Sequence, residues 1–212
     1  ARQVLTAQPK NPAARALIVR AYLMRGDVTK AAAELASLEK EYPNAVPVQN
    51  LVAARNLAAG NSAAARASYA KVLATAPNDL EALQGLVVID LQAGRKKDAV
   101  DRVDAALKRM TPSADLCVLA GRTHAAAGNL ARSEELLKQA IELEPARLAA
   151  YGLLGQLYVV QKRLGDARDQ YQELLKRNPR SVPANTMLGM LLEAQKDLPA
   201  AEAQYQKTLA VN

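Results

Sequence analysis

The chain has 212 residues, of which 50% are apolar and 23% are charged, and its formal net charge is +7 at pH 7. This is the composition of an ordinary soluble protein, and no apolar run approaches the roughly 18 residues that a membrane-spanning helix requires. The single cysteine, Cys117, excludes an internal disulfide.

A period of 34 residues runs through the whole sequence. Prolines recur at this interval or at twice it, at Pro9, Pro43, Pro77, Pro145 and Pro179, and a displaced copy stands at Pro112. Small residues keep the same interval at Ala31, Ala65, Ala99, Ser133, Ala167 and Ala201. A fixed period of this length is typical of similar units stacked in an array rather than of one globular core.

The period divides the chain into six units, each of which we expect to form two helices. Residues 1–11 are the tail of an incomplete repeat, and the units follow at 12–45, 46–79, 80–113, 114–147, 148–181 and 182–212. In the fifth unit Tyr151, Leu154, Leu157 and Tyr158 are spaced to form one apolar stripe on a first helix. A polar break follows, and a second stripe begins at Ala167. The whole chain is therefore expected to be one array of helix pairs.

The turn between the two helices of a unit has its own signal. Glycine recurs where each first helix should end, at Gly26, Gly60, Gly94 and Gly128, and a left-handed glycine there lets the chain reverse. Lys162 and Lys196 hold the same place in the last two units. We expect these two turns to be slightly more strained than the other four or to have a different shape.

These features resemble the tetratricopeptide repeat (TPR), a helix–turn–helix unit. The small residues at which the two helices of the family cross match Gly121, Gly155 and Gly189. The large residue of the second helix matches Leu35, Tyr69, Val103, Leu137, Tyr171 and Tyr205, and the tyrosine of the first helix matches Tyr22 and Tyr158. The resemblance covers the whole chain and implies an all-α fold, an alpha-alpha solenoid with right-handed superhelical stacking. The chain departs from the family in having no tryptophan and no phenylalanine.

The sequence offers no constellation of residues suited to catalysis. The single histidine, His124, stands where other units carry Tyr22 and Tyr158, so we interpret it as a helix-packing residue. Cys117 stands at a core position and is interpreted as a buried thiol. Histidines, cysteines and carboxylates with the spacing of metal ligands are missing, as is a glycine-rich phosphate loop. We therefore expect no enzyme activity, no catalytic residue, no metal and no cofactor.

The resemblance implies a binding function. In TPR proteins the first helices line a concave face, and this implies a groove for a peptide or helix of a protein partner. The predicted groove residues are Arg20, Leu23, Met24, Asn50, Leu57, Gln84, Val88, Leu91, Val118, Arg122, Gln156, Val159 and Met190. Such a groove is largely aliphatic, and Arg20 and Arg122 are its cations, either of which could fix an acidic group of the partner.

Two functions stay open on the sequence alone. The first is a non-enzymatic scaffold that binds a protein or peptide in the concave groove. The second is a structural spacer in a longer bacterial protein of assembly or export, for example of polysaccharide or cell-surface components. Both ends of the sequence fall inside a repeat, which indicates a fragment whose uncapped ends would associate head to tail.

Other partners and the compartment are constrained less directly. The positive charge is spread along the chain and interleaved with acids, and most of the seven tyrosines occupy core positions. Stacking platforms for bases are therefore missing, and we do not expect a nucleic acid as partner. We also expect no membrane insertion. The sequence does not distinguish a cytoplasmic from a periplasmic or envelope-associated location.

Overall fold

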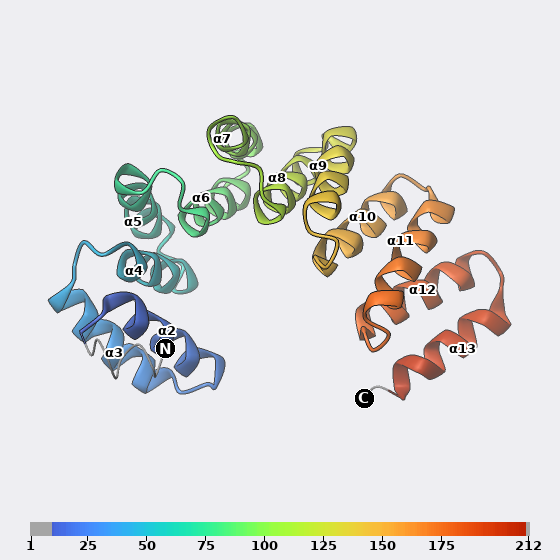
Figure 1. Cartoon of the computed structure of the whole chain (residues 1–212), viewed down its shortest axis with the longest axis horizontal. Coiled ribbons are helices and arrows are strands. Elements are labelled where there is room, and N and C mark those ends of the chain that lie inside the picture. The colour runs from blue at the N-terminus through green and yellow to red at the C-terminus, as the bar shows by residue number, and fades with distance from the viewer. Residues whose placement is uncertain (1–9, 211–212) are drawn as a thin grey trace. The chain divides into compact units, whose positions relative to one another are not determined.

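The computed structural model describes residues 10–210, and within that range it contains twelve α-helices and no strand (Figure 1). The first helices of six pairs are α2 (Pro12–Met24), α4 (Val46–Ala58), α6 (Leu80–Gln92), α8 (Ala114–Ala127), α10 (Leu148–Val160) and α12 (Val182–Ala194). The second helices are α3 (Val28–Glu41), α5 (Ser62–Thr75), α7 (Lys96–Arg109), α9 (Leu130–Leu143), α11 (Leu164–Arg177) and α13 (Leu198–Leu209). The all-α class and the solenoid of helix pairs expected from the sequence are confirmed.

Each first helix is followed by a residue with left-handed backbone geometry. In the first four pairs this residue is a glycine, with φ between 73° and 93°. In the last two pairs it is Lys162 or Lys196, with φ of 60° and 63°. A side chain in this conformation costs roughly 1–2 kcal/mol relative to glycine. The two lysine turns therefore have the unfavourable geometry that their sequence predicts.

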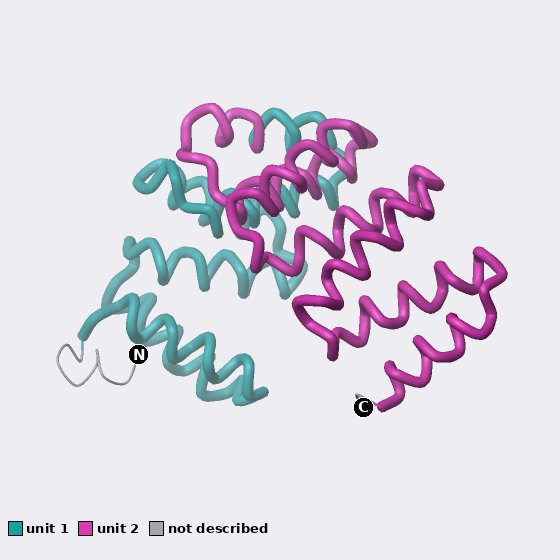
Figure 2. The backbone as a smooth tube through the Cα atoms, turned by 45° about the vertical axis from the view of Figure 1, so that its right-hand side comes forward, with its two compact units in different colours: residues 1–102 teal, residues 103–212 magenta. Residues whose placement is uncertain are grey.

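The chain divides into two compact units, residues 1–102 and residues 103–212, which Figure 2 shows in different colours. The division falls within α7.

In the first unit α3 packs between α2 and α4, and α5 packs between α4 and α6. Leu35 and Leu38 of α3 contact Val19 of α2 and Val48 of α4 in one cluster of buried side chains. A second cluster joins α4, α5 and α6 through Ala53, Ala65, Tyr69, Val72, Ala82, Leu86 and Ile89. These apolar contacts remove the stripes of the helices from water, which is the main stabilising contribution to such a stack.

In the second unit the core extends from α9 to α12. Its buried members are Leu137, Tyr151, Leu154, Leu157, Tyr158, Ala167, Tyr171, Leu174, Ala184, Leu188 and Leu191. The helices of a pair cross at a glycine, as the resemblance implies. A Cβ on Gly155 would lie 2.8 Å from Cζ of Tyr171, and a Cβ on Gly189 would lie 2.5 Å from the ring of Tyr205. Only a glycine leaves room for these rings.

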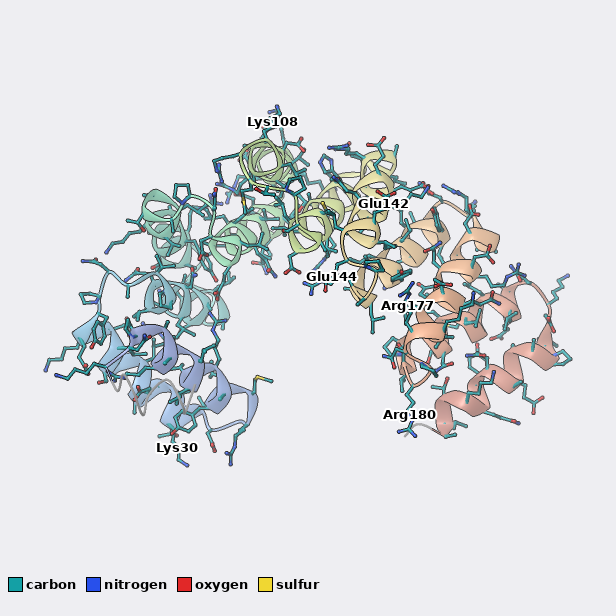
Figure 3. All side chains as sticks on the ribbon, in the orientation of Figure 1. Lys30, Lys108, Glu142, Glu144, Arg177 and Arg180 are labelled. Atoms are coloured by element: carbon teal, nitrogen blue, oxygen red, sulfur yellow. The ribbon has the colours of Figure 1, made fainter. Side chains whose placement is uncertain are left out.

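The polar residues of the helices cover the surface that the core leaves. Lys30 of α3 and Lys108 of α7 point away from the helices that carry them (Figure 3). Among the described residues, no helix combines the length and the apolar character needed to span a membrane.

Candidate binding surfaces

The predicted groove residues of the first unit differ in how much of each side chain is exposed. Leu23 and Met24, at the end of α2, are 51% and 89% exposed. Gln84 of α6 is also exposed, whereas Leu57, Val88 and Leu91 are partly buried. Leu57 packs against the cluster that joins α4, α5 and α6. Among the predicted groove residues of this unit, the large apolar side chains that are most exposed therefore lie at the end of α2.

Arg20, one of the two predicted anchors, already has a carboxylate partner. Its Nη2 donates to both carboxylate oxygens of Glu81, at 2.7 and 2.6 Å, and so joins α2 to α6. The two side chains are 40% and 39% exposed. An ion pair this exposed contributes only about 0–1 kcal/mol, so the carboxylate of a ligand could displace Glu81.

Asn50, one of the predicted groove residues, does not lie on the surface. Asn50 is 2% exposed, and its Nδ2 donates to Oδ1 of Asp79 at 3.0 Å. Asp79 in turn accepts a hydrogen bond from the backbone N–H of Ala82 and so caps α6. Asn50 thus connects α4 to the start of α6, because its place in the repeat faces the neighbouring helix rather than solvent.

In the second unit the predicted residues form two groups. Val118 and Val159 are partly buried and pack against the core, so they can form only the floor of a binding surface. Arg122 of α8, Gln156 of α10 and Met190 of α12 are exposed. Met190 is 53% exposed. Unlike Arg20, Arg122 contacts no carboxylate within residues 10–210.

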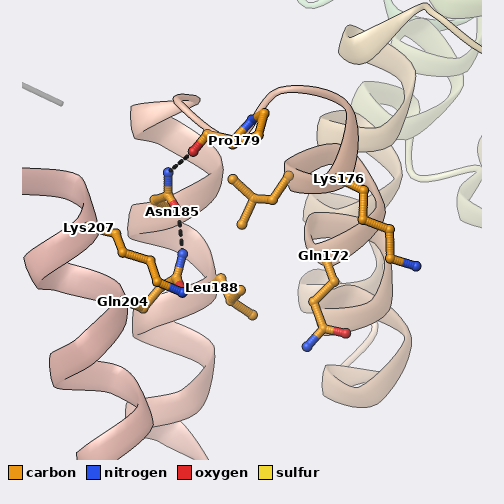
Figure 4. A pocket seen from close by; sticks show the side chains of 8 residues that line it. Gln172, Lys176, Pro179, Asn185, Leu188, Gln204 and Lys207 are labelled. Atoms are coloured by element: carbon orange, nitrogen blue, oxygen red, sulfur yellow. Dashed lines mark hydrogen bonds between the residues drawn. The ribbon is translucent and has the colours of Figure 1, made fainter. Parts of the chain in front are cut away.

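A surface pocket of about 540 Å³ lies elsewhere, between the second helices α11 and α13 (Figure 4). Asn185 of α12 forms part of its wall, and its Nδ2 donates to the carbonyl oxygen of Pro179 at 3.0 Å. Gln204 of α13 donates to Oδ1 of Asn185. The buried polar groups of the pocket therefore satisfy one another, and they offer no unpaired group to a ligand.

His124 and Cys117 are structural residues. His124 is 4% exposed, and its Nε2 lies 3.0 Å from Oδ1 of Asp104. Its Nδ1 lies 3.4 Å from Nδ2 of Asn129. Cys117 is fully buried, and burial raises the pKa of its thiol. Among the described residues, no group of three or more histidines, cysteines or carboxylates is placed to hold a metal ion.

A charged cluster around Asp90 of α6 was not predicted from the sequence. The side chain of Asp90 is fully buried, and Arg66, Arg95 and Arg102 all donate hydrogen bonds to it. Burial raises the pKa of Asp90, but the three arginines outweigh that effect and hold the pKa below its ordinary value. One signal was available: a carboxylate stands here at the place that carries Tyr22, His124 and Tyr158 in other repeats.

Comparison with known proteins supports the repeat. Family models described as tetratricopeptide repeat match residues 1–54, 56–117, 118–179 and 153–210. No match was found among curated proteins.

Several solved structures are similar to this chain. MamA is 22% identical over 76% of this chain and 94% of its own, with a TM-score of 0.64. YrrB, described as a TPR protein with an unusual peptide-binding site, is 17% identical over 84% of this chain and 92% of its own, with a TM-score of 0.58. PilF of Pseudomonas aeruginosa is 16% identical over 91% of this chain and 88% of its own, with a TM-score of 0.70. At these identities the likeness establishes the fold alone. Because the family models match nearly the whole chain, the protein belongs to the tetratricopeptide repeat family.

Proposed function

We propose that the chain is a non-enzymatic protein-interaction scaffold that binds a peptide or helix of a partner on the inner face of its first helices. That its six repeats act as one array is part of this proposal. The TPR family is a family of interaction modules, and YrrB is a TPR protein with a peptide-binding site of its own. A bound peptide or helix would use aliphatic anchors, with one or two charged groups that fix its orientation.

The observation that carries the proposal is the exposure of large apolar side chains on the first helices. Leu23, Met24, Val160 and Met190 are between 51% and 89% exposed, and all four lie at places of the repeat that face inward in the family. Large exposed apolar side chains that share one face are a common mark of an interaction surface. Arg122 adds an exposed cation to this face of the second unit.

Arg20 would take part only after it releases Glu81. Because the Arg20–Glu81 pair is about 40% exposed on both sides, its loss costs little. Glu81 would thus compete weakly with an acidic group of the partner. Replacing it, in Glu81→Gln, should tighten the binding of an acidic peptide several-fold.

Site-specific photo-crosslinking tests the proposed face. A photoreactive amino acid at position 24 or 190 should crosslink to peptides selected from a random library displayed on phage. The matched positions are Leu143 and Leu198, which are 48% and 62% exposed but lie on the second helices α9 and α13. Crosslinking at positions 143 and 198 but not at positions 24 and 190 would contradict the proposal.

Charge substitutions provide a second test. Leu23→Glu/Met24→Glu in the first unit and Arg122→Glu/Met190→Glu in the second should weaken binding of a selected peptide at least tenfold. Leu143→Glu/Leu198→Glu is the control and should leave binding unchanged. Because the substituted side chains are exposed, helicity measured by circular dichroism should be that of the wild type in all three variants.

The structural spacer is a second candidate, and one observation favours it. The last helix, α13, exposes Leu198 to 62% and Leu209 to 75%. Exposed apolar side chains on α13 would allow contact with another copy in a head-to-tail arrangement. Sedimentation of the free chain over a range of concentrations decides between the two. Growth into longer species that Leu198→Glu/Leu209→Glu prevents would support the spacer, and a monomer at all concentrations would argue against it.

A further inference from the structure

The cluster around Asp90 has more positive charge than the buried carboxylate requires. Nη2 of Arg66 and Nε of Arg95 donate to Oδ1 of Asp90, the latter at 3.1 Å. Nε and Nη2 of Arg102 donate to Oδ2, at 3.2 and 3.0 Å. The three guanidinium groups come from α5, from the turn between α6 and α7, and from α7. One buried carboxylate thus holds three cations together.

The three arginines have N–H donors that Asp90 does not use. Two carboxylate oxygens accept about four hydrogen bonds, so Asp90 is saturated, whereas each guanidinium carries five N–H donors. Within residues 10–210 the other carboxylate in contact with the cluster is Asp98, 3.8 Å from Nε of Arg95 and 57% exposed. Two negative charges therefore face three positive ones, and most of the guanidinium donors are unused by Asp90.

The guanidinium groups reach the surface even though their common partner is buried. The side chains of Arg66, Arg95 and Arg102 are 34%, 44% and 29% exposed, against 0% for Asp90. Asp90 already holds the three guanidinium groups in place. Ligand binding therefore costs little additional side-chain entropy. Planar, fixed guanidinium groups are well suited to the oxygens of a carboxylate or phosphate.

The corresponding places in the second unit have no such surplus. At His124 the neighbours are Asp104 and Asn129. At Tyr158 the neighbours include Arg163 and also Glu134, whose carboxylate accepts from the tyrosine hydroxyl at 3.1 Å. Packing of the repeat therefore does not require three arginines at this place.

We propose that Arg66, Arg95 and Arg102 form a binding site for the oxyanion groups of an acidic segment of a partner protein. Either the phosphate of a phosphorylated residue or the carboxylate of an aspartate or glutamate would supply these oxygens. Lys96, exposed next to Arg95, extends the positive surface. The site lies on α5, α7 and the turn before α7, and it is thus separate from the inner face of the first helices. It is independent of the proposed function.

Fluorescence anisotropy with three labelled peptides at low ionic strength tests the site. The peptides share one sequence and carry two phosphoserines, two glutamates or two serines. We expect both acidic peptides to bind at least tenfold more tightly than the serine peptide, and their ratio identifies the preferred oxyanion. Equal affinity for all three peptides would overturn the proposal.

The double variant Arg66→Gln/Arg95→Gln tests whether the acidic peptide binds at these two arginines. It keeps the two hydrogen bonds between Arg102 and Asp90, and it should lose about tenfold or more in affinity for the acidic peptide, as expected for lost charge-assisted hydrogen bonds. Arg55→Gln/Arg132→Gln removes the same charge from two exposed arginines, each of which pairs with a single glutamate. This control should change affinity less than twofold, and an equal loss in both variants would mean generic attraction.

Two further measurements test whether the guanidinium geometry is needed and whether a nucleic acid is the ligand instead. Arg66→Lys/Arg95→Lys keeps the charge but loses the planar donors, so it should bind several-fold more weakly than the wild type. A variant that binds as tightly as the wild type would show that no guanidinium site exists. A single-stranded oligothymidylate is the competing ligand: if it binds through Arg66 and Arg95 while both acidic peptides do not, the site recognises nucleic acid and the proposal is wrong.

Discussion

Two corners of the molecule, the turn from α6 to α7 and the turn from α10 to α11, are built from equivalent positions of the repeat. Different polar residues occupy these positions in the two corners. In the first corner Asp90 accepts hydrogen bonds from Arg66 and Arg95. The residues 68 positions later are Tyr158, Glu134 and Arg163. There the tyrosine hydroxyl donates to Glu134, and the guanidinium carbon of Arg163 lies 4.2 Å from the tyrosine ring centre.

The two corners differ in which helix carries the carboxylate. In the first corner the carboxylate is on the first helix and an arginine on the preceding second helix. In the second corner the carboxylate, Glu134, is on the preceding second helix and accepts from Arg163 at 2.7 Å. Burial raises the pKa of Glu134, but hydrogen bonds from Lys138, Arg163 and Tyr158 hold it below its ordinary value. The repeat thus fixes where two polar groups meet, and the two corners differ in which of these two places carries the carboxylate.

The largest effect should follow removal of the charge of Asp90. Asp90→Asn leaves three arginines facing a neutral group, and loss of one partner of a buried ion pair costs about 3–5 kcal/mol. We expect the free energy of unfolding to fall by about 2–3 kcal/mol, since the arginines are 29–44% exposed and water can solvate them. Unfolding by urea, followed by circular dichroism, measures the loss. A cost below about 0.5 kcal/mol would mean that the charge of Asp90 is not needed to hold the arginines.

Acid should reproduce the effect of this substitution. The pKa of Asp90 is lower in the folded chain than in the unfolded chain, where it is about 3.9. The stabilisation from Asp90 is therefore complete above about pH 4 and is lost as the pH falls through the folded pKa. The difference in unfolding free energy between wild type and Asp90→Asn should be constant from about pH 7 to pH 5 and shrink below about pH 4. A difference that grows towards low pH would reverse the assigned direction.

Exchanging the chemistry of the two corners tests whether the pair acts as a unit. Asp90→Tyr alone should destabilise the chain, because it leaves the arginines without their carboxylate. Adding Arg66→Glu reproduces in the first unit the combination of Glu134, Tyr158 and Arg163 in the second. We expect the second substitution to recover about 1–2 kcal/mol in a double-mutant cycle. Additive losses would show that the places of the two corners are not equivalent.

The sequence predicted the repeat and its turns because each depends on residues close together in the chain. The 34-residue period marked the helix pairs, and the left-handed places fell at Lys162 and Lys196 as expected. Burial of Tyr171 at the crossing with Gly155 followed from the family pattern. All these features belong to one repeat and its turn.

The surface chemistry was harder to predict, because it depends on side chains from different repeats. Arg20 and Glu81 are 61 residues apart and meet only when three repeats stack. Asn50 was assigned to the groove, although its amide is used by Asp79, 29 residues away. The inward places of the family indicate a face, but they do not show which side chains on that face pair with one another.

Two tyrosines of the second unit should respond in opposite directions to loss of the hydroxyl. The hydroxyl of Tyr171 is buried and has no hydrogen-bond partner among the described residues, whereas that of Tyr158 donates to Glu134. Tyr171→Phe should therefore stabilise the chain by about 1 kcal/mol, and Tyr158→Phe should destabilise it by about 1 kcal/mol.

The titration of Tyr171 provides a control for the prediction on Tyr171→Phe. Burial raises the pKa of Tyr171 to about 12 in the folded chain, above roughly 10 in the unfolded chain. Because the unfolded chain releases this proton first, the free energy of unfolding should fall as the pH rises from about 10 to about 12. Absorbance of tyrosinate during alkaline titration should show a tyrosine that titrates near pH 12 in the wild type and is missing in Tyr171→Phe. A titration curve that the substitution leaves unchanged would assign this shift to another residue.

The smallest effect concerns the turn of each corner, where Gly94 and Lys162 are equivalent. Both have left-handed backbone geometry. An added Cβ at Gly94 would meet no heavy atom within 4 Å, so the cost of a side chain there comes from the backbone alone. The greater freedom of glycine in the unfolded chain offsets part of this backbone cost. Lys162→Gly should therefore stabilise the chain by about 0.5–1 kcal/mol, and Gly94→Lys should destabilise it by a similar amount. Thermal unfolding of both variants measures the pair of shifts. If both substitutions destabilise, the lysine side chain contributes more than its backbone strain costs, and the two corners differ in their turns as well as in their charges.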